Sequence, residues 1–140
     1  MYRVKAVWNR GLQFVGMSES GHAIVMDTKS ELGGFESAAT PVETTLLGLC
    51  GCTGMDVVSI LWKKRVEFDD FEVAVEAEKS PQPPNYFTRI ELVFRIWGAN
   101  VSEAALQRSI ELSSEKYCTV TGTLRGKAEV TYRYEINPER

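Results

Sequence analysis

Few residues in this chain are capable of covalent or acid–base chemistry: three cysteines, Cys50, Cys52 and Cys118, and one histidine, His22. A thiolate is both a nucleophile and a two-electron reductant, and two thiols that meet can be oxidised to a disulfide. His22 opens an expected strand beside a turn and has no evident serine or aspartate partner, so we expect it on the surface and find no support for a hydrolase triad. No glycine-rich phosphate loop is present either, and the chemistry to consider is therefore that of thiols.

Cys50 and Cys52 lie two residues apart in a segment expected to be helical. That spacing rotates their side chains by about 200° and points them to nearly opposite faces. The two thiols can then neither pair with each other nor bind one metal ion, and the usual Cys-x-x-Cys and histidine spacings of zinc sites are missing. We expect no metal and no cofactor. Taken alone, a cysteine in an apolar helix is more often inert core than reactive.

Cys52 has Asp56 one helical turn further along the chain. A carboxylate nearby raises the pKa of a thiol unless a cation compensates, so a reactive Cys52 needs an arginine from another segment. Arg10, in the first turn of the chain, is the residue we name for this role. The other arginines that remain open are Arg3, Arg65 and Arg95.

A long helix must position Cys52. Thr40-Pro41-Val42-Glu43 offers an N-cap hydroxyl, a proline suited to the first helical position and an acid that completes a capping box. We expect this helix to run to Arg65, where basic residues complement the negative end of the helix dipole. Glu43 is explained by capping, and a role in positioning a site residue is its alternative.

The body of this helix, Thr44 to Trp62, is apolar or small on every side except at Asp56, which predicts a helix buried all round. Asp56 itself is expected to be a buried acid bonded to a neighbouring strand. Three glycines, Gly48, Gly51 and Gly54, favour close approach by another element. Because 140 residues can hardly surround such a helix, we expect a second subunit to cover it. A transmembrane span is the alternative, and the charge of Asp56 near the centre argues against it.

The remaining elements predict an α+β fold. Alternating residues indicate three N-terminal strands in an antiparallel meander, a loop without regular structure, two long strands after the first helix, a second helix starting at Asn100 and delivering Cys118 at its end, and a last strand. The expected strand ranges are 2–8, 12–17, 22–27, 68–79, 86–97 and 127–136, with the loop at 28–39 and the second helix ending near Tyr117.

The length, composition and net charge of the chain limit the classes of protein to which it can belong. A chain of 140 residues with 44% hydrophobic and 25% charged residues is typical of one globular domain, here 1–140. The net charge of −3 and the absence of a basic stripe argue against a nucleic-acid partner. No signal-peptide pattern is recognised at the N-terminus, and an odd number of cysteines argues against a disulfide framework, so we expect a cytoplasmic protein.

Three motifs in this order carry a resemblance that spans nearly the whole chain. They are Thr40-Pro41-Val42-Glu43, then Gly51-Cys52-Thr53 with Asp56-Val57-Val58, and finally Ser114-Glu115-Lys116-Tyr117-Cys118. With the arrangement of strands and helices, they make the chain resemble the OsmC/Ohr family of thiol-dependent hydroperoxide reductases.

The resemblance implies an intertwined α+β homodimer, with antiparallel sheets packed around a long central helix and two sites at the subunit interface. It implies that Cys52 reduces an organic hydroperoxide to an alcohol and becomes a sulfenic acid, which Cys118 resolves as a disulfide. An external dithiol, lipoyl-type in the family, would restore both thiols, and no metal or flavin is required.

The chain departs from the characterised branches where the thiolate is activated. Those branches place a glutamate directly after the helix-opening proline, whereas here Val42 occupies that place and the acid is Glu43, about 100° further round the helix. No residue here clearly corresponds to the activating arginine of those branches. The stretch that matches its place is Gly11 to Gly21, and Arg10 lies just before it. The chain thus resembles a divergent branch, and the alternative function is a non-catalytic member of the fold that binds a small hydrophobic or acyl ligand.

Overall fold

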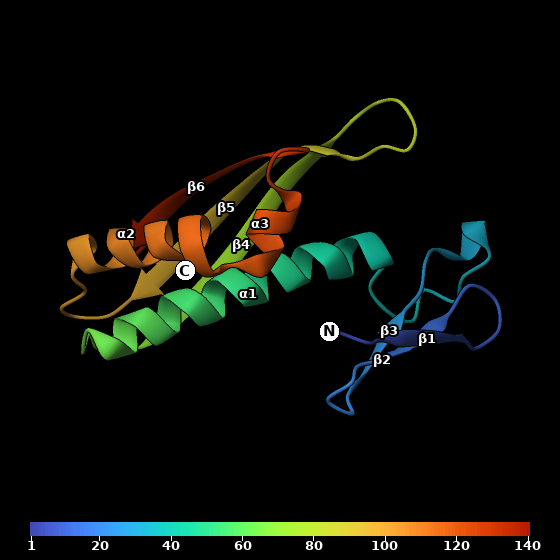
Figure 1. The fold of residues 1–140 in the computed structure, drawn as a ribbon, viewed down its shortest axis with the longest axis horizontal. Coiled ribbons are helices and arrows are strands. Elements are labelled where there is room, and N and C mark those ends of the chain that lie inside the picture. The colour runs from blue at the N-terminus through green and yellow to red at the C-terminus, as the bar shows by residue number, and fades with distance from the viewer. The chain divides into compact units, whose positions relative to one another are not determined.

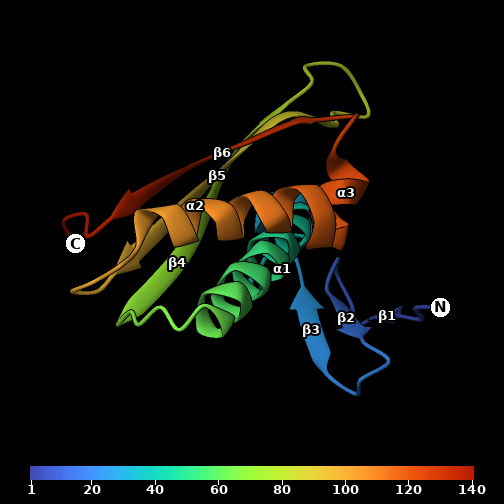
Figure 2. The same cartoon turned by 60° about the vertical axis from the view of Figure 1, so that its left-hand side comes forward.

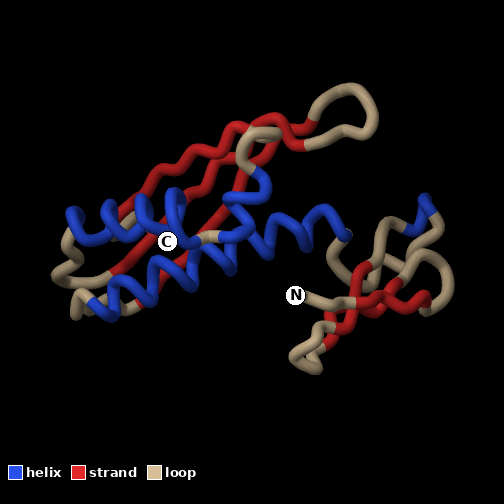
Figure 3. Tube along the Cα trace, viewed as in Figure 1, coloured by secondary structure: helices blue, strands red, loops and turns tan.

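The structure, a computed structural model, describes residues 1–140 and divides into two compact units, Met1–Leu47 and Gly48–Arg140, each described by itself. The first unit contains three strands and the first turns of a long helix, and the second contains the rest of that helix, a further three strands and the helices that follow (Figure 1). Figure 3 separates these helices and strands along the Cα trace. The α+β class predicted from the sequence is confirmed.

The first unit is the predicted antiparallel meander. Its strands β1 (Lys5–Trp8), β2 (Phe14–Met17) and β3 (Ala23–Met26) pair in the order β1-β2-β3, each shorter than expected. The loop that follows was predicted to have no regular structure and contains one short 3₁₀ turn, η1 (Ser30–Leu32). The prediction was wrong there because a single turn is too short to leave a periodic signal.

Buried Asp27 fastens this loop to the end of β3. The side chain is 1% exposed and its carboxylate accepts hydrogen bonds from the backbone N–H groups of Thr28 at 2.8 Å, Phe35 at 3.2 Å and Ser37 at 3.3 Å. The Ser37 hydroxyl donates a further bond to the same carboxylate. These bonds, the Ser37 hydroxyl foremost, hold the pKa of Asp27 below its ordinary value against the opposing effect of burial.

This carboxylate makes the first unit sensitive to acid. Because the folded pKa of Asp27 is lowered, its stabilisation is present above the unfolded pKa of about 3.9 and is lost as pH falls through the folded value. We expect the first unit of the Asp27→Asn variant to be less stable at neutral pH than that of the wild type and to lose less stability as the pH falls. Amide hydrogen exchange of the first unit at several pH values measures both effects. The control is Glu31→Gln, which replaces an exposed acid of η1. The stability of this variant should depend on pH as that of the wild type does.

Helix α1 (Pro41–Lys63) begins with the predicted capping box. The Thr40 N–H donates to Glu43 Oε1 at 3.0 Å, and the Glu43 N–H donates to Thr40 Oγ1 at 3.1 Å. The helix ends two residues before the predicted Arg65, because Arg65 adopts a left-handed φ of 59° and the Val66 N–H bonds back to the Leu61 carbonyl at 3.0 Å.

The second unit holds a three-stranded sheet in the order β4-β5-β6, formed by β4 (Asp70–Lys79), β5 (Phe87–Trp97) and β6 (Glu129–Ile136). β4 and β5 are antiparallel as predicted, but β6 runs parallel to β5. The expectation of wholly antiparallel sheets was therefore wrong. The chain between β5 and β6 crosses back over the sheet through a helix, so the last strand re-enters in the direction of β5.

That crossover contains three helical segments. α2 (Glu103–Leu112) leads into one π-helical turn, η2 (Ser113–Tyr117), and then into α3 (Thr119–Leu124), which was not predicted. The N-cap of α2 is Ser102, whose hydroxyl accepts from the Ala105 N–H at 3.2 Å, and not the predicted Asn100.

Within the second unit, α1 and α2 lie on the same face of the β4-β5-β6 sheet in both views (Figures 1 and 2). The core between sheet and helices is closely filled. Its buried side chains are Leu49, Val57 and Leu61 of α1, Ile90, Leu92, Phe94 and Ile96 of β5, and Leu106 and Ile110 of α2.

A single chain does not bury α1 on every side, as expected of 140 residues that can hardly surround so long a helix. Met55 is 75% exposed and Trp62 is 68% exposed. A Cβ atom built at Gly54 would lie 3.4 Å from Val73 of β4, but Gly48 and Gly51 have open space around them. One face of α1 therefore packs in the core and another is left apolar and uncovered.

By length and composition alone α1 is also apolar enough to span a membrane. One such helix is weak evidence, because the core helix of a soluble protein has the same character. Leu49, Val57 and Leu61 are fully buried, so one face of α1 packs in a core, while only 22% of its most apolar window is buried in the single chain.

Candidate active site

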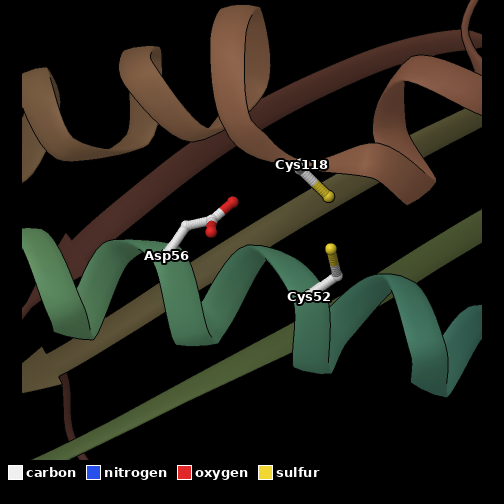
Figure 4. Close-up of side chains that lie close together, drawn as sticks. All are labelled: Cys52, Asp56 and Cys118. Atoms are coloured by element: carbon white, nitrogen blue, oxygen red, sulfur yellow. The ribbon is translucent and has the colours of Figure 1, made fainter.

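Three side chains from two distant segments converge in the second unit. The Sγ atoms of Cys52 and Cys118 and a carboxylate oxygen of Asp56 all lie within 4.8 Å of one another. Figure 4 shows Cys52 and Asp56 one turn apart on the same side of α1, with Cys118 reaching toward them from the segment between α2 and α3. The fold thus brings together the two thiols that the sequence analysis singled out.

The π-helical turn and α3 fix the position of Cys118. Its backbone N–H donates to the Ser113 carbonyl at 2.8 Å and closes the turn. Cys118 is then the N-cap residue of α3, where its Sγ accepts from the Thr121 N–H at 3.3 Å. Single π-helical turns are often found at functional sites, where they place one side chain apart from the regular helix.

Burial controls the protonation of Cys118, which is 5% exposed. Loss of solvent raises its pKa above the ordinary value, and the neighbouring Cys52 thiol contributes in the same direction, while hydrogen bonding from Thr121 partly offsets the rise. Cys118 is therefore a protonated thiol at neutral pH and needs a proton acceptor before it can act as a nucleophile.

Asp56 is the carboxylate beside both thiols. The Ser113 hydroxyl donates to Asp56 Oδ2 at 2.9 Å, which orients the carboxylate toward the sulfurs. The sequence predicted a buried acid bonded to a neighbouring strand. That prediction was wrong, because Asp56 is only partly buried and its partner Ser113 lies in the turn that follows α2.

Cys50 lies outside this cluster, as its rotation on α1 requires. Its thiol is partly buried, and this burial raises its pKa. All three cysteines are free thiols in the structure.

Glu43 and Arg10 belong to the first unit, where each has a local partner. The Glu43 carboxylate is engaged in the capping box, and the bonds from Thr40 lower its pKa. The Arg10 guanidinium stacks on the Trp8 ring, 4.7 Å from its centroid. Their proposed part in activating Cys52 stays a prediction.

Two of the three arginines left open by the sequence, Arg3 and Arg95, have other neighbours. Arg3 pairs with Glu19 at 3.7 Å. Arg95 donates to Glu72 at 3.0 Å and to Glu135 at 2.8 Å, in an ion-pair network across the β4-β5-β6 sheet.

Sequence reasoning missed Ser113, Thr121 and Arg125. Arg125 follows α3 and donates to the Ser114 hydroxyl at 2.6 Å, so a cation lies beside the turn that carries Cys118. For Ser113 and Thr121 the available signal was their spacing around Cys118, since Ser113 precedes it by one π-helical turn and Thr121 follows it at the N3 position of a helix.

The chain as a whole is similar to known proteins. The model of the OsmC-like protein family matches residues 34–133. Protein YhfA of Escherichia coli K12 is 41% identical over 134 residues, which cover 96% of each chain. A structure from structural genomics is 38% identical with a TM-score of 0.84, covering 96% of this chain and 97% of the other. An organic hydroperoxide resistance protein OsmC from Legionella pneumophila shares the fold at 17% identity, with a TM-score of 0.70 and 96% coverage of both chains.

Proposed function

Because the chain belongs to the OsmC family, which includes organic hydroperoxide resistance proteins, we propose that it is a thiol-dependent peroxidase that reduces organic hydroperoxides to alcohols. The observation that carries the proposal is the meeting of Cys52 and Cys118 within 4.8 Å, from segments far apart in the chain. A thiol peroxidase with two cysteines needs such a pair, because the first oxidation product must be reached by a second thiol.

The reaction follows from this pair. The Cys52 thiolate attacks the hydroperoxide, ROOH, at the oxygen that becomes the sulfenic acid, the O–O bond breaks, and a proton completes the alcohol ROH. The Cys118 thiol then condenses with the Cys52 sulfenic acid, forming the disulfide and releasing water. The Asp56 carboxylate lies within reach of the proton that Cys118 must lose.

Turnover requires an external dithiol, for which a lipoyl-type group is our proposal. It exchanges with the disulfide, returns both thiols and leaves as its own disulfide. We place the protein in the cytoplasm, where reducing conditions sustain this exchange. Glu43 and Arg10 are proposed to assist activation of Cys52.

We also propose that the functional unit is a homodimer. The uncovered face of α1 in the second unit combines exposed Met55 and Trp62 with Gly48 and Gly51, where another helix could approach closely. We expect the Met55→Glu variant to be a monomer in solution, because a buried unpaired charge opposes association. Light scattering measures this, with Ala104→Glu on the exposed side of α2 as the control that should leave the dimer intact.

Titration with one equivalent of cumene hydroperoxide, followed by intact mass and peptide mapping, tests the peroxidase. We expect the wild type to lose two hydrogens as a Cys52–Cys118 disulfide. The Cys118→Ser variant should stop at a trappable sulfenic acid on Cys52. If Cys52 stays reduced over minutes of exposure, the proposed activity is wrong.

The alternative function, binding of a small hydrophobic or acyl ligand, has one observation in its favour. An apolar hollow of about 300 Å³ lies in the first unit against the β1-β2-β3 sheet, with Ile24 and Met26 in its lining. Unchanged ligand binding in Cys52→Ser, together with an unreactive Cys52 in the wild type, would favour this function.

A further inference from the structure

We propose that the cluster of Cys52, Asp56 and Cys118, with both cysteines reduced, is a binding site for a thiophilic divalent cation of the Zn²⁺ type. Three ligand atoms, two sulfurs and one carboxylate oxygen, already lie within 4.8 Å of one another. No metal was expected from the sequence, because Cys50 and Cys52 point to nearly opposite faces of one helix and the usual spacings of zinc ligands are missing. The ligand set found here is assembled by the fold from two separate segments.

The geometry is close to what such a cation requires. With Zn–S bonds of about 2.3 Å and a Zn–O bond of about 2.1 Å, tetrahedral coordination places the two sulfurs about 3.8 Å apart and each sulfur about 3.6 Å from the oxygen. Since no ligand pair is further apart than 4.8 Å, adjustments of about 1 Å close the site. Side-chain rotation of Cys52 and Asp56, both partly exposed on α1, can supply them.

The groups around the cluster suit a metal site. Ser113 donates to Asp56 Oδ2 at 2.9 Å, and that bond leaves Oδ1 free to coordinate while fixing the carboxylate. The Thr121 N–H donates to Cys118 Sγ at 3.3 Å and favours the thiolate that a metal needs. Such outer partners orient ligands in most metal sites.

The ligand types narrow the choice of cation. Two thiolates favour Zn²⁺ and related soft ions over Mg²⁺ and Ca²⁺, which prefer oxygen ligands. Three protein ligands leave the fourth tetrahedral position open for water or an external thiol.

If the chain is the proposed peroxidase, the metal ion and the hydroperoxide compete for the same two sulfur atoms. Oxidation of the metal-bound pair by ROOH and two protons yields the Cys52–Cys118 disulfide, free Zn²⁺, ROH and water. The disulfide offers no thiolate, so oxidation releases the cation, and the bound cation slows oxidation.

Titration of the reduced, metal-free full chain with Co²⁺ under anaerobic conditions, followed by displacement with Zn²⁺, tests the site. We expect thiolate-to-cobalt charge transfer with tetrahedral d–d bands, saturating at a single ion per chain. Both signals should disappear in Cys52→Ser and Cys118→Ser. Asp56→Asn should bind at least about 10-fold more weakly, and Asp56→Glu, which keeps a carboxylate, less so. Cys50→Ser is the matched control and should bind like the wild type.

A second measurement needs no variant and therefore does not depend on how the substitutions fold. Zn²⁺ should protect Cys52 and Cys118 of the wild type from alkylation by N-ethylmaleimide and leave the alkylation rate of Cys50 unchanged. Equal protection of all three thiols, or Asp56→Asn binding as tightly as the wild type, would overturn the proposed ligand set.

The metal site and the peroxidase can fail separately. A chain that shows no cobalt charge transfer while Cys52 still reacts with cumene hydroperoxide has no such metal site and keeps its proposed activity. Cobalt binding in a chain whose Cys52 is inert to hydroperoxide supports the site and removes the peroxidase.

Discussion

Replacing Cys52 by serine is expected to abolish reduction of cumene hydroperoxide, lowering kcat/KM by about 1000-fold or more, which corresponds to roughly 4 kcal/mol in the barrier. A serine hydroxyl is neither ionised at neutral pH nor able to accept the peroxide oxygen, so no sulfenic acid can form. Consumption of the hydroperoxide with a small dithiol as reductant measures the loss.

Cys50→Ser is the control that distinguishes this loss from general damage to α1. Cys50 lies on the same helix but outside the cluster with Cys118, so its replacement should leave the rate unchanged. Equal loss in both variants would show that the reactive thiol is not Cys52 alone. Residual activity in Cys52→Ser above about one tenth of wild type would contradict the assigned role.

Replacing Phe94 by alanine is expected to lower the free energy of unfolding of the second unit by about 3–5 kcal/mol. Phe94 lies in β5 and is 1% exposed, and its ring lies 6.3 Å from the ring of Phe71. Removing it loses buried apolar surface and leaves a cavity that the sheet cannot close. Because native domains are stable by only about 5–15 kcal/mol, this change is large.

Thermal and urea denaturation followed by circular dichroism measure the effect. Phe35→Ala is the matched control, since Phe35 is 58% exposed in the first unit and its truncation should shift the midpoint little. A Phe94→Ala midpoint within a degree or two of the wild type would mean that β5 is not the centre of the core. Peroxide reactivity of Cys52 should fall with the folded fraction.

Local sequence signals predicted most of the secondary structure. The capping box at Thr40 and Glu43 fixed the start of α1, and strict alternation along β5 identified its buried face. The parallel pairing of β6 could not be predicted, because a strand carries the same alternation whichever direction its neighbour runs. The short α3 was missed because six residues give too little periodicity.

The candidate site was predictable in part. Cys52 and Cys118 were singled out because their segments resemble those of a known family, not because local spacing joins them. The contact of Ser113 with Asp56 links residues 57 positions apart and depends on how the crossover lies on α1. Asp56 was expected one helical turn from Cys52, but the Ser113 hydroxyl that holds its carboxylate was not. The part of Arg10 in activating Cys52 stays a prediction.

The crossover that makes β6 parallel to β5 also sets when the thiol pair comes into existence during folding. Cys52 lies before β4 and Cys118 lies within the last connection, so their meeting closes a long loop of chain. Long-range contacts of this kind form late, after the entropy of loop closure has been offset by other pairings. A nascent or half-folded chain would thus carry Cys52 without its partner. The ability to form the Cys52–Cys118 disulfide therefore shows that the fold is complete. Pulses of hydroperoxide at successive times of refolding would then show when the crossover packs against α1.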